Sequence, residues 1–413
     1  MPELAATPST ALSFDTSASN AVARSRIQSI DVLRGIVMVI MALDHVRDFF
    51  HVSANTADPL NLAVTTPALF FTRWITHFCA PTFVFLSGVS IYLQSFRKTK
   101  KELSLFLIKR GIWLVFAEVI LLAFIFSFNP LYNIIFLEVI WAIGISMIIL
   151  GLLIYLPFNF ILAVGLLIVL GHNLLDIPEA SPNFKPGFWY NILHNRGALP
   201  FANNHVLIVL YPFLPWTGLM ILGYCTGIFF SSKYSAEERK KILAIIGIMI
   251  ILFFVLIRFI NMYGDPVQWK NENNWLNTFF SFINLQKYPP SLLFLCVTIG
   301  PAIVLLAYLE NIQNRFTNIV MVYGRVPFFY FLVHFFIIHV VTTIIFFARG
   351  HNMDDAMKAA KQVPFLFLVP GEGFSLPVVY LVWLAVVIIM YPLCKWYDGY
   401  KTNHKEKRWL SYL

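Results

Sequence analysis

IDVLRGIVMVIMALDHVRDFFH, residues 30–51, is an apolar run that carries ionisable side chains near both of its ends. As a helix it is long enough to cross the roughly 30 Å of hydrocarbon in a bilayer. Its last eight residues include Asp44, His45, Arg47, Asp48 and His51. A charged group deep in hydrocarbon costs at least about 2.5–3.5 kcal/mol. We therefore expect a membrane span whose polar side chains face other protein segments or a water-filled cavity.

The rest of the chain has the same apolar character. Of its 413 residues 59% are hydrophobic and 12% are charged, whereas soluble domains are about 45–50% apolar. Segments of this kind must cross the bilayer as helices, because backbone amides find no partner in lipid. We predict an all-α, polytopic integral membrane protein with about ten transmembrane helices. The predicted spans are 30–50, 68–96, 104–127, 131–155, 158–175, 206–230, 241–262, 288–309, 319–348 and 375–397.

Charge patterning predicts the orientation of these spans. The net charge is +9, and basic residues cluster before the first span, in short connections between spans and after the last span. With ten spans these segments all fall on one side, which the positive-inside rule identifies as the cytoplasm. Both termini are then cytoplasmic, and the partner implied is the lipid bilayer, with no nucleic acid. Residues 1–26 are predicted to be a disordered tail, 27–400 the transmembrane domain and 401–413 a basic cytoplasmic tail.

The cysteines argue against a metal centre. Cys79, Cys225, Cys296 and Cys394 lie in or beside apolar segments and show no paired spacing. A disulfide framework or a zinc site is therefore not expected. We predict no metal ligands.

A polar stripe runs along the first span. At about 100° per residue, one helical face carries Asp31, Arg34, Met38, Met41, His45 and Asp48. His45 follows Arg34 by eleven residues, which is about 16 Å of helical rise. Arg34 is then near the cytoplasmic mouth and His45 lies beyond the middle of the bilayer. Asp44, Arg47 and His51 form an adjoining strip, and Arg47 and Asp48 could equally be an ion-paired helix end.

Two further spans carry similar pairs. In the second span Arg73 and His77 are four residues apart on one face of the outer half. In the ninth span, YGRVPFFYFLVHFFIIH, Arg325 lies near the cytoplasmic end and His334 about 13 Å further outward if the helix is continuous. Each histidine could also be a packed, hydrogen-bonded core residue.

These residue types suit group transfer across the membrane. Guanidinium groups bind phosphate well, so arginines at the cytoplasmic mouth indicate a phosphorylated donor. A histidine deep in the same channel suits proton transfer, because its pKa lies near neutrality. Asp44 is expected to orient that imidazole. The candidate catalytic residues are His45, His51, Asp44 and His77, and the candidate donor-binding residues are Arg34, Arg325, His334 and Arg73.

The motifs also resemble a known family. IDVLRGIVMVIMALDH resembles the opening span of transmembrane acyltransferases, in which an arginine precedes a catalytic histidine by ten intervening residues. Together with THFCAPTFVFLSG, KYPPSLLFLCVTIGPA and YGRVPFFYFLVHFFIIH, it resembles bacterial relatives of heparan-α-glucosaminide N-acetyltransferase over about residues 27–400. The resemblance implies acetyl-CoA or another acyl-CoA as a co-substrate, with no permanently bound cofactor. It also implies an amino sugar or other glycan as the acceptor, and the bacterial cytoplasmic (inner) membrane as the location.

The resemblance leaves two histidines as candidates for the catalytic base. The general acyltransferase motif favours His45. In the lysosomal enzyme an asparagine stands near the place of His45 and the catalytic histidine comes later, which favours His51 as the match. We rank His45 first. This histidine is a general base or, alternatively, a transient acyl carrier.

Two other function classes fit the same residues. A transporter or proton-coupled carrier would use the intramembrane histidines as a proton relay. A membrane scaffold would contain them only as buried polar pairs. Gly218, Gly223 and Gly227 favour a close helix–helix contact, either within the chain or in a homodimer.

Overall fold

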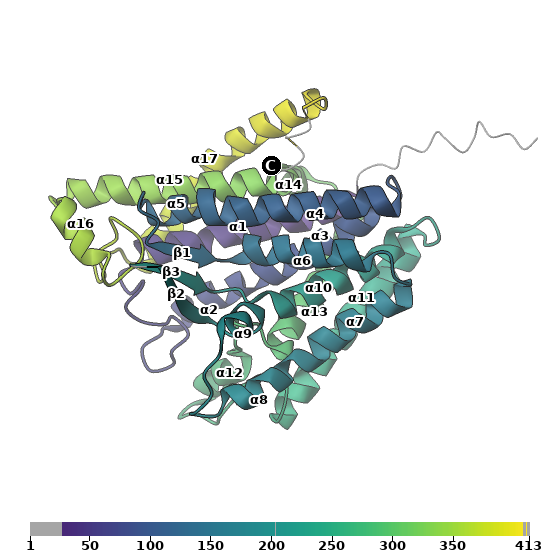
Figure 1. Ribbon diagram of the computed structural model, residues 1–413, viewed down its shortest axis with the longest axis horizontal. Coiled ribbons are helices and arrows are strands. Elements are labelled where there is room, and N and C mark those ends of the chain that lie inside the picture. Colours follow the sequence, from purple (N-terminus) through teal and green to yellow (C-terminus); the bar gives the residue numbers. More distant parts are fainter. Residues whose placement is uncertain (1–26, 203, 408–409, 411–413) are drawn as a thin grey trace, which may run out of the picture.

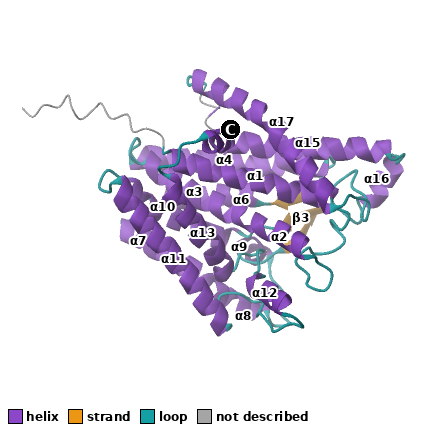
Figure 2. Cartoon of the chain, turned by 180° about the vertical axis from the view of Figure 1, so that it is seen from behind, coloured by secondary structure: helices purple, strands orange, loops and turns teal. Residues whose placement is uncertain are grey.

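The computed structural model describes residues 27–202, 204–407 and 410. The predicted tail at 1–26 and most of the last six residues lie outside this part. Helices make up most of the described chain, with one small sheet at one end (Figures 1 and 2). Eight of the described helical rods are long and apolar enough to cross a membrane. The chain is therefore a multi-pass, all-α membrane protein, as the apolar runs predict.

The charged helix α1 (Gln28–Phe50) lies inside the bundle (Figure 1). It contacts α3 (Cys79–Gln94), α13 (Leu292–Leu309), α14 (Arg315–Arg325), α15 (Pro327–Ala348) and α17 (Leu376–Asn403). Asp31, Asp44 and Arg47 are buried there. The charges of α1 thus face protein, which removes the cost of exposing them to lipid. The helix is not among the eight apolar rods, and neither is the 15-residue α6 (Val139–Leu153).

Several rods contain a local change of helix type. The second rod runs through α2 (Pro67–Ile75), η2 (Thr76–Phe78) and α3, and the 3₁₀ turn precedes Pro81. Because proline has no N–H to donate to residue 77, the regular pattern breaks at that turn. Three further rods are composite. One runs through α4 (Lys100–Ala117), the π-helical η3 (Glu118–Leu122) and α5 (Ala123–Ser127), and the next through α7 (Phe158–Gly171), η4 (His172–Leu175) and α8 (Asp176–Glu179). The third joins α10 (Phe213–Thr226) to η5 (Gly227–Phe230), whereas the following α11 (Ala236–Ile260) is a single helix.

The small sheet replaces parts of two predicted spans. Strands β1 (Ile134–Leu137), β2 (Gly197–Ala202) and β3 (His205–Val209) have the order β1-β3-β2. β1 pairs in parallel with β3, with Ile134 opposite Val206, and β2 pairs antiparallel with β3. The spans predicted to start at 131 and 206 therefore begin as strands, and their helices start later. Short helices α9 (Phe188–Leu193), α12 (Trp275–Ile283) and α16 (Met353–Ala359) occur in the three long connections.

The ninth predicted span is two helices. α14 ends at Arg325 and α15 begins at Pro327. Val326, between them, has φ −129° and ψ 51°, because a residue before proline is forced out of the helical region. Arg325 and His334 thus lie on different helices, and the 13 Å estimate for a continuous helix does not hold.

Glycines allow close helix crossings. A Cβ atom at Gly324 of α14 would collide with the carbonyl oxygen of Asp31 on α1. On α10, a Cβ at Gly223 would collide with the carbonyl oxygen of Phe85, and one at Gly218 would press on Ile168 of α7. The predicted small-residue contact of α10 is therefore made within the chain.

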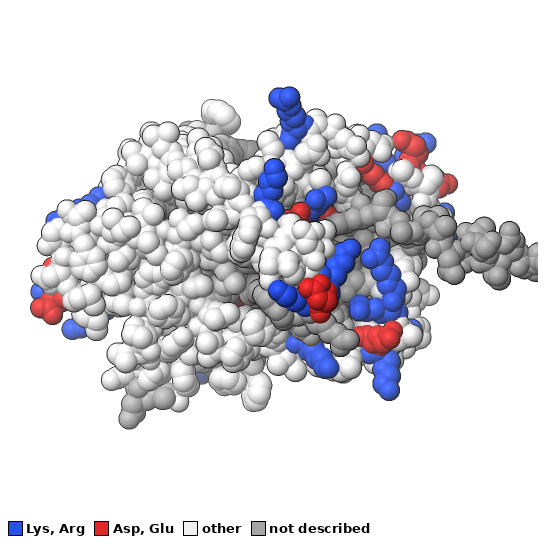
Figure 3. Space-filling model, turned by 90° about the horizontal axis from the view of Figure 1, so that it is seen from above, with Lys and Arg blue, Asp and Glu red and all other residues white. Residues whose placement is uncertain are grey.

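The charges concentrate at the ends of the molecule. Figure 3 shows Lys and Arg side chains gathered at one end, a few charges at the opposite tip, and a wide uncharged band between them. Residues from both chain ends, Ile27 and Lys401, line a cavity at the more strongly basic end together with Arg97, Arg239 and Arg325. The segments predicted to share one membrane face thus converge in space, which agrees with an even number of spans.

Candidate functional site

A large cavity opens at the basic end of the bundle. Its volume is about 740 Å³, within the usual range for ligand pockets. Six basic side chains line it, against one carboxylate, Asp31. They are Arg34, Arg97, Arg110, Arg239, Arg325 and Lys401. Three of these arginines pair with carboxylates, Arg34 with Asp31, Arg239 with Glu310 and Arg325 with Asp398. The six basic groups still outnumber these three carboxylates, which favours an anionic ligand, and the planar guanidinium groups suit phosphate.

Arg34 is held in place by three different helices. Its Nη1 donates to Asp31 Oδ1 at 3.0 Å on α1 and to the carbonyl oxygen of Gly324 at 3.1 Å on α14. Its Nη2 donates to Ser90 Oγ at 2.8 Å on α3. The glycine at 324 makes the second bond possible, because it lets α14 approach α1 at backbone distance. The guanidinium therefore has a fixed direction at the cavity wall.

A second, smaller cavity lies next to the large one along α1. It has a volume of about 50 Å³, and its wall includes Met38, Met41, Asp44 and His45. The two cavities share four wall residues: Phe83, Ile140, Pro327 and Phe328. Five of the six residues in the predicted stripe thus line one cavity or the other, and Asp48 is the exception. These four apolar side chains therefore form the boundary between the cavity at Arg34 and the cavity at His45.

His45 is paired with His334 across two helices. Nδ1 of His45 lies 2.7 Å from Nε2 of His334, and the two rings stack with centroids 5.0 Å apart. Nδ1 of His334 lies 2.7 Å from the carbonyl oxygen of Tyr330, one turn earlier in α15. His334 is fully buried. Its partner is therefore His45, rather than a donor bound in the large cavity.

The hydrogen bonds assign the tautomers of this pair. A carbonyl oxygen only accepts, so Nδ1 of His334 carries a proton and Nε2 of the neutral ring is an acceptor. Nδ1 of His45 must then donate to it, which leaves the lone pair on Nε2 of His45. No hydrogen bond to that Nε2 atom occurs within residues 27–202, 204–407 and 410. His45 is thus prepared to accept a proton at Nε2.

Part of this site lies in a segment that matches a known family. The family model described as heparan-alpha-glucosaminide N-acetyltransferase, catalytic, matches residues 26–257, more than half of the chain. The chain belongs to this family. No curated protein gives a significant match to the chain. The matched segment contains Arg34, His45, His51, Arg73 and His77, whereas Arg325 and His334 lie beyond it.

Asp44 has a different environment from the one predicted. Both of its carboxylate oxygens accept from Arg73, at 2.6 and 2.5 Å, and Arg47 and Lys287 lie 2.8 and 3.8 Å away. Arg47 also contacts Asp48 at 2.5 Å. Among the described contacts, none joins Asp44 to the ring of His45. Two expectations differ from the structure: the ring of His45 is hydrogen-bonded to His334 and not to Asp44, and Arg73, which pairs with Asp44, lines neither the large nor the small cavity.

His51 is less suited than His45 to act as the general base. Its Nδ1 accepts from the backbone N–H of Ser53 at 3.2 Å and lies 2.8 Å from Ser53 Oγ. Nε2 of the neutral ring then carries the proton, and neither nitrogen offers a free lone pair. His51 lines neither the large nor the small cavity. Burial, and secondarily the charge of Arg47, lowers the pKa of His51 below its usual value.

His77 is a buried ring beside the site. It lies in η2, is 3% exposed, and its ring centroid is 5.2 Å from that of Phe294. Its neighbours Thr76 and Cys79 line the small cavity, but His77 does not. The structure therefore brings His45, His334 and Asp44 close to one cavity and leaves His51 and His77 outside it.

Other residues at the site were not among the predicted ones. Arg110, in the middle of α4, lines the large cavity, and Lys287 and Glu138 line the small one. Arg110 could have been identified from the sequence, because an arginine inside an apolar run must face protein or a cavity. Glu118, another intramembrane carboxylate, accepts from the backbone N–H groups of Glu138 and Trp141 at 3.3 and 3.0 Å, so it caps the start of α6.

Proposed function

We propose that this protein transfers an acyl group from acyl-CoA in the large basic cavity to an amino sugar or other glycan at the opposite membrane face. The family description, an N-acetyltransferase, favours acetyl as the acyl group. The observation that carries the proposal is the alignment of the two cavities along α1, with Arg34 on the wall of one and His45 on the wall of the other. About 16 Å of helical rise separates these residues. A long, thin acyl-pantetheine arm suits such a path, since only its head carries phosphate.

The donor end is supported by charge. Six basic side chains line one cavity, and after the carboxylates paired with Arg34, Arg239 and Arg325 are counted the lining is still basic, which suits a nucleotide with several phosphates. The positive-inside rule makes this end cytoplasmic, where acyl-CoA is made. We propose the bacterial cytoplasmic membrane as the location, as the resemblance of the sequence motifs implies. Acyl-CoA is then a co-substrate that enters and leaves in each cycle.

The acid–base chemistry is supported by the tautomer of His45. As the acceptor amine or hydroxyl attacks the thioester carbonyl, Nε2 of His45 takes its proton while the new C–N or C–O bond forms. The C–S bond breaks, and the proton passes to the departing coenzyme sulfur. His334 accepts the Nδ1–H of His45 throughout and so holds the ring in the basic tautomer. Direct transfer and a transient acyl group on Nε2 of His45 both fit this geometry.

The test is acyl transfer in sealed vesicles that contain the purified full-length protein. Radiolabelled acetyl-CoA is supplied on one side and a panel of amino sugars and glycans on the other. We expect label on an acceptor with wild type and with His51→Ala, and a loss of about 10²–10⁴-fold with His45→Ala. Label retained on the protein without acceptor would identify the acyl carrier route.

Two results would contradict the proposal. Equal rates for wild type and His45→Ala would remove the assigned base. Movement of an unmodified solute across the vesicle membrane, independent of any acyl donor, would instead indicate the carrier function that the same histidines allow.

A further inference from the structure

Lys287 lines the same small cavity as His45. It lies in the connection that leads to α13, and the cavity wall also includes Asp44 of α1. The side chain of Lys287 is 8% exposed, so protein encloses most of its ammonium group. A buried cation is costly unless ion pairs and hydrogen-bond acceptors compensate it. We therefore compared its charge partners with its hydrogen bonds.

The ammonium group of Lys287 has a charge partner but unused hydrogen-bond donors. Nζ lies 3.8 Å from Asp44 Oδ2, which is beyond hydrogen-bond distance. Arg73 already donates to both oxygens of Asp44, at 2.6 and 2.5 Å, and Arg47 lies 2.8 Å from Oδ1. The ring centroid of Tyr288 is 5.1 Å from Nζ, near enough for a cation–π contact. In the part of the chain that the structure describes, Nζ donates no hydrogen bond.

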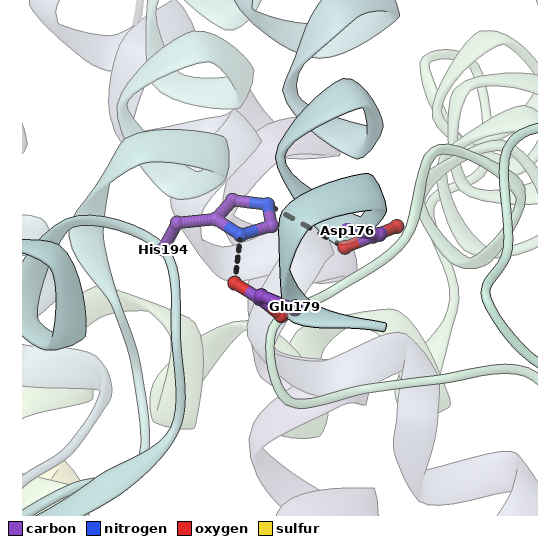
Figure 4. A group of neighbouring side chains, drawn as sticks. All are labelled: Asp176, Glu179 and His194. Atoms are coloured by element: carbon purple, nitrogen blue, oxygen red, sulfur yellow. Dashed lines mark hydrogen bonds and ion pairs between the residues drawn. The ribbon is translucent and has the colours of Figure 1, made fainter. Parts of the chain in front are cut away.

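A second buried polar cluster shows the contrast. His194, which follows α9, lies beside Glu179 and Asp176 of α8 (Figure 4). Nδ1 of His194 is 3.0 Å from Glu179 Oε1, and Nε2 is 3.3 Å from Nδ1 of His172. Both ring nitrogens of His194 thus have partners within the protein, which leaves neither for a ligand. Lys287 differs because its N–H groups remain available on a cavity wall.

The backbone around Lys287 is held in place. Asp265 Oδ2 accepts from the backbone N–H of Gln286 at 2.9 Å and from Ser291 Oγ at 2.5 Å. The N–H of Ser291 donates to the carbonyl oxygen of Gln286 at 3.0 Å, which closes the turn that contains Lys287. Arg258 donates to four backbone carbonyl oxygens of the same connection. The Lys287 side chain therefore starts from a fixed backbone position.

The proposed acyl transfer needs a hydrogen-bond donor at this place. When the acceptor attacks, the thioester carbonyl carbon becomes tetrahedral and its oxygen carries a negative charge until the C–S bond breaks. Donors fixed where such a charge develops usually make the largest single contribution to the rate. His45 does not supply one, because its Nε2 keeps a lone pair for the acceptor's proton and its Nδ1 donates to His334.

We propose that Lys287 is a catalytic residue whose ammonium group donates a hydrogen bond to the oxyanion of the tetrahedral intermediate. This assignment rests on the proposed function. No bond to Lys287 forms or breaks, and its protons stay on Nζ. The carbonyl re-forms as the coenzyme sulfur leaves, and the sulfur takes the proton held by His45. Asp44 balances the charge of the ammonium group without taking up its N–H groups.

Kinetics in the vesicle assay give the first test. Lys287→Met removes the cation but keeps an unbranched side chain. We expect kcat to fall by about 10²–10³-fold, as when one oxyanion donor is removed, with KM for acetyl-CoA nearly unchanged. Lys270→Met is the matched control, because Lys270 is an exposed lysine of the same connection and lines neither the large nor the small cavity. It should keep the wild-type rate.

A binding measurement separates oxyanion recognition from donor binding and needs no acceptor. Two analogues of acetyl-CoA have a methylene group in place of the thioester sulfur. One is a methyl ketone that mimics the substrate, and the other is a trifluoromethyl ketone that hydrates to a tetrahedral gem-diol. Mimics of the transition state bind more tightly than mimics of the substrate. By calorimetry on the purified full-length protein, Lys287→Met should weaken binding of the trifluoromethyl ketone strongly and that of the methyl ketone little.

The outcomes distinguish this assignment from the proposed function. A wild-type kcat in Lys287→Met, or equal weakening of both ketones, would overturn the role of Lys287 alone, provided that His45→Ala is inactive. If neither analogue binds wild type, both proposals fail. If Lys287→Met does not fold, Lys287→Gln, which keeps a polar end beside Asp44, takes its place. An unchanged ratio of the two ketone affinities in that variant would contradict the assignment.

Discussion

Nδ1 of His45 on α1 and Nε2 of His334 on α15 lie 2.7 Å apart, although 289 residues separate them in the chain. The backbone carbonyl of Tyr330 fixes the direction of this hydrogen bond, because it requires the proton on Nδ1 of His334. The consequence is a basic Nε2 on His45, next to the apolar boundary between the two cavities.

Replacing His334 tests this positioning role. His334→Phe keeps a ring of similar shape but removes the acceptor for His45. We expect kcat to fall by about 10²–10⁴-fold, as when a catalytic histidine loses its orienting partner, with little change in KM for acyl-CoA. His334→Gln, whose amide oxygen can accept the same proton, should restore part of the rate. A rise in KM with kcat unchanged would instead support the original assignment of His334 to donor binding.

Arg110 offers a test of the donor cavity. Arg110→Gln removes one of six cations from the wall, and a hydrogen bond to a charged group contributes about 1.5–3 kcal/mol. We expect KM for acyl-CoA to rise about tenfold or more, with kcat nearly unchanged. The adjacent Lys109 is exposed and does not line the cavity, so Lys109→Gln is the control. Equal effects of the two variants would indicate a general charge effect.

Asp44 is expected to be a structural residue. Asp44→Asn leaves Arg47, Arg73 and Lys287 with one carboxylate fewer in a buried cluster, and breaking a buried ion pair costs about 3–5 kcal/mol. We expect a sharp fall in yield and melting temperature. Adding Arg73→Gln removes one unpaired cation and should recover part of the stability. A fully stable Asp44→Asn protein without activity would assign Asp44 to catalysis.

His51 predicts a pH dependence of stability. Its pKa in the folded protein lies below the usual 6.5, so the unfolded chain binds a proton there at a pH where the native protein does not. The stabilisation is present above pH 6.5 and is lost as the pH falls through the folded pKa. His51→Gln should therefore show a smaller drop in melting temperature between pH 7 and pH 5 than wild type. An identical drop in both proteins would contradict this.

Much of the fold follows from local patterns, and the parts that do not are those set by distant contacts. The period of the α1 stripe correctly places Arg34, Met38, Met41 and His45 towards cavities. The helix break before Pro327 could have been predicted from the sequence, because a residue before proline is forced out of the helical region. The pairing of β1 with β3 joins segments about 70 residues apart and has no local signature in short apolar runs.

The site shows the same division. Residue type and depth were enough to single out His45 and His334, but not to say that they touch. Asp44 adjoins His45 in sequence and so was expected to orient it. In the structure, the carboxylate oxygens of Asp44 instead accept hydrogen bonds from Arg73 and form an ion pair with Arg47. Proximity in the chain is a poor guide to hydrogen bonding when consecutive side chains point about 100° apart.

The four side chains shared by the two cavities also bear on the electrical insulation of the cell. Phe83, Ile140, Pro327 and Phe328 offer no charge or hydroxyl to a hydrated ion, and narrow hydrophobic necks hinder ion passage by expelling water. In the proposed acyl transfer, the energy of a thioester on one side of the bilayer then drives a reaction on the far side while the membrane potential is kept.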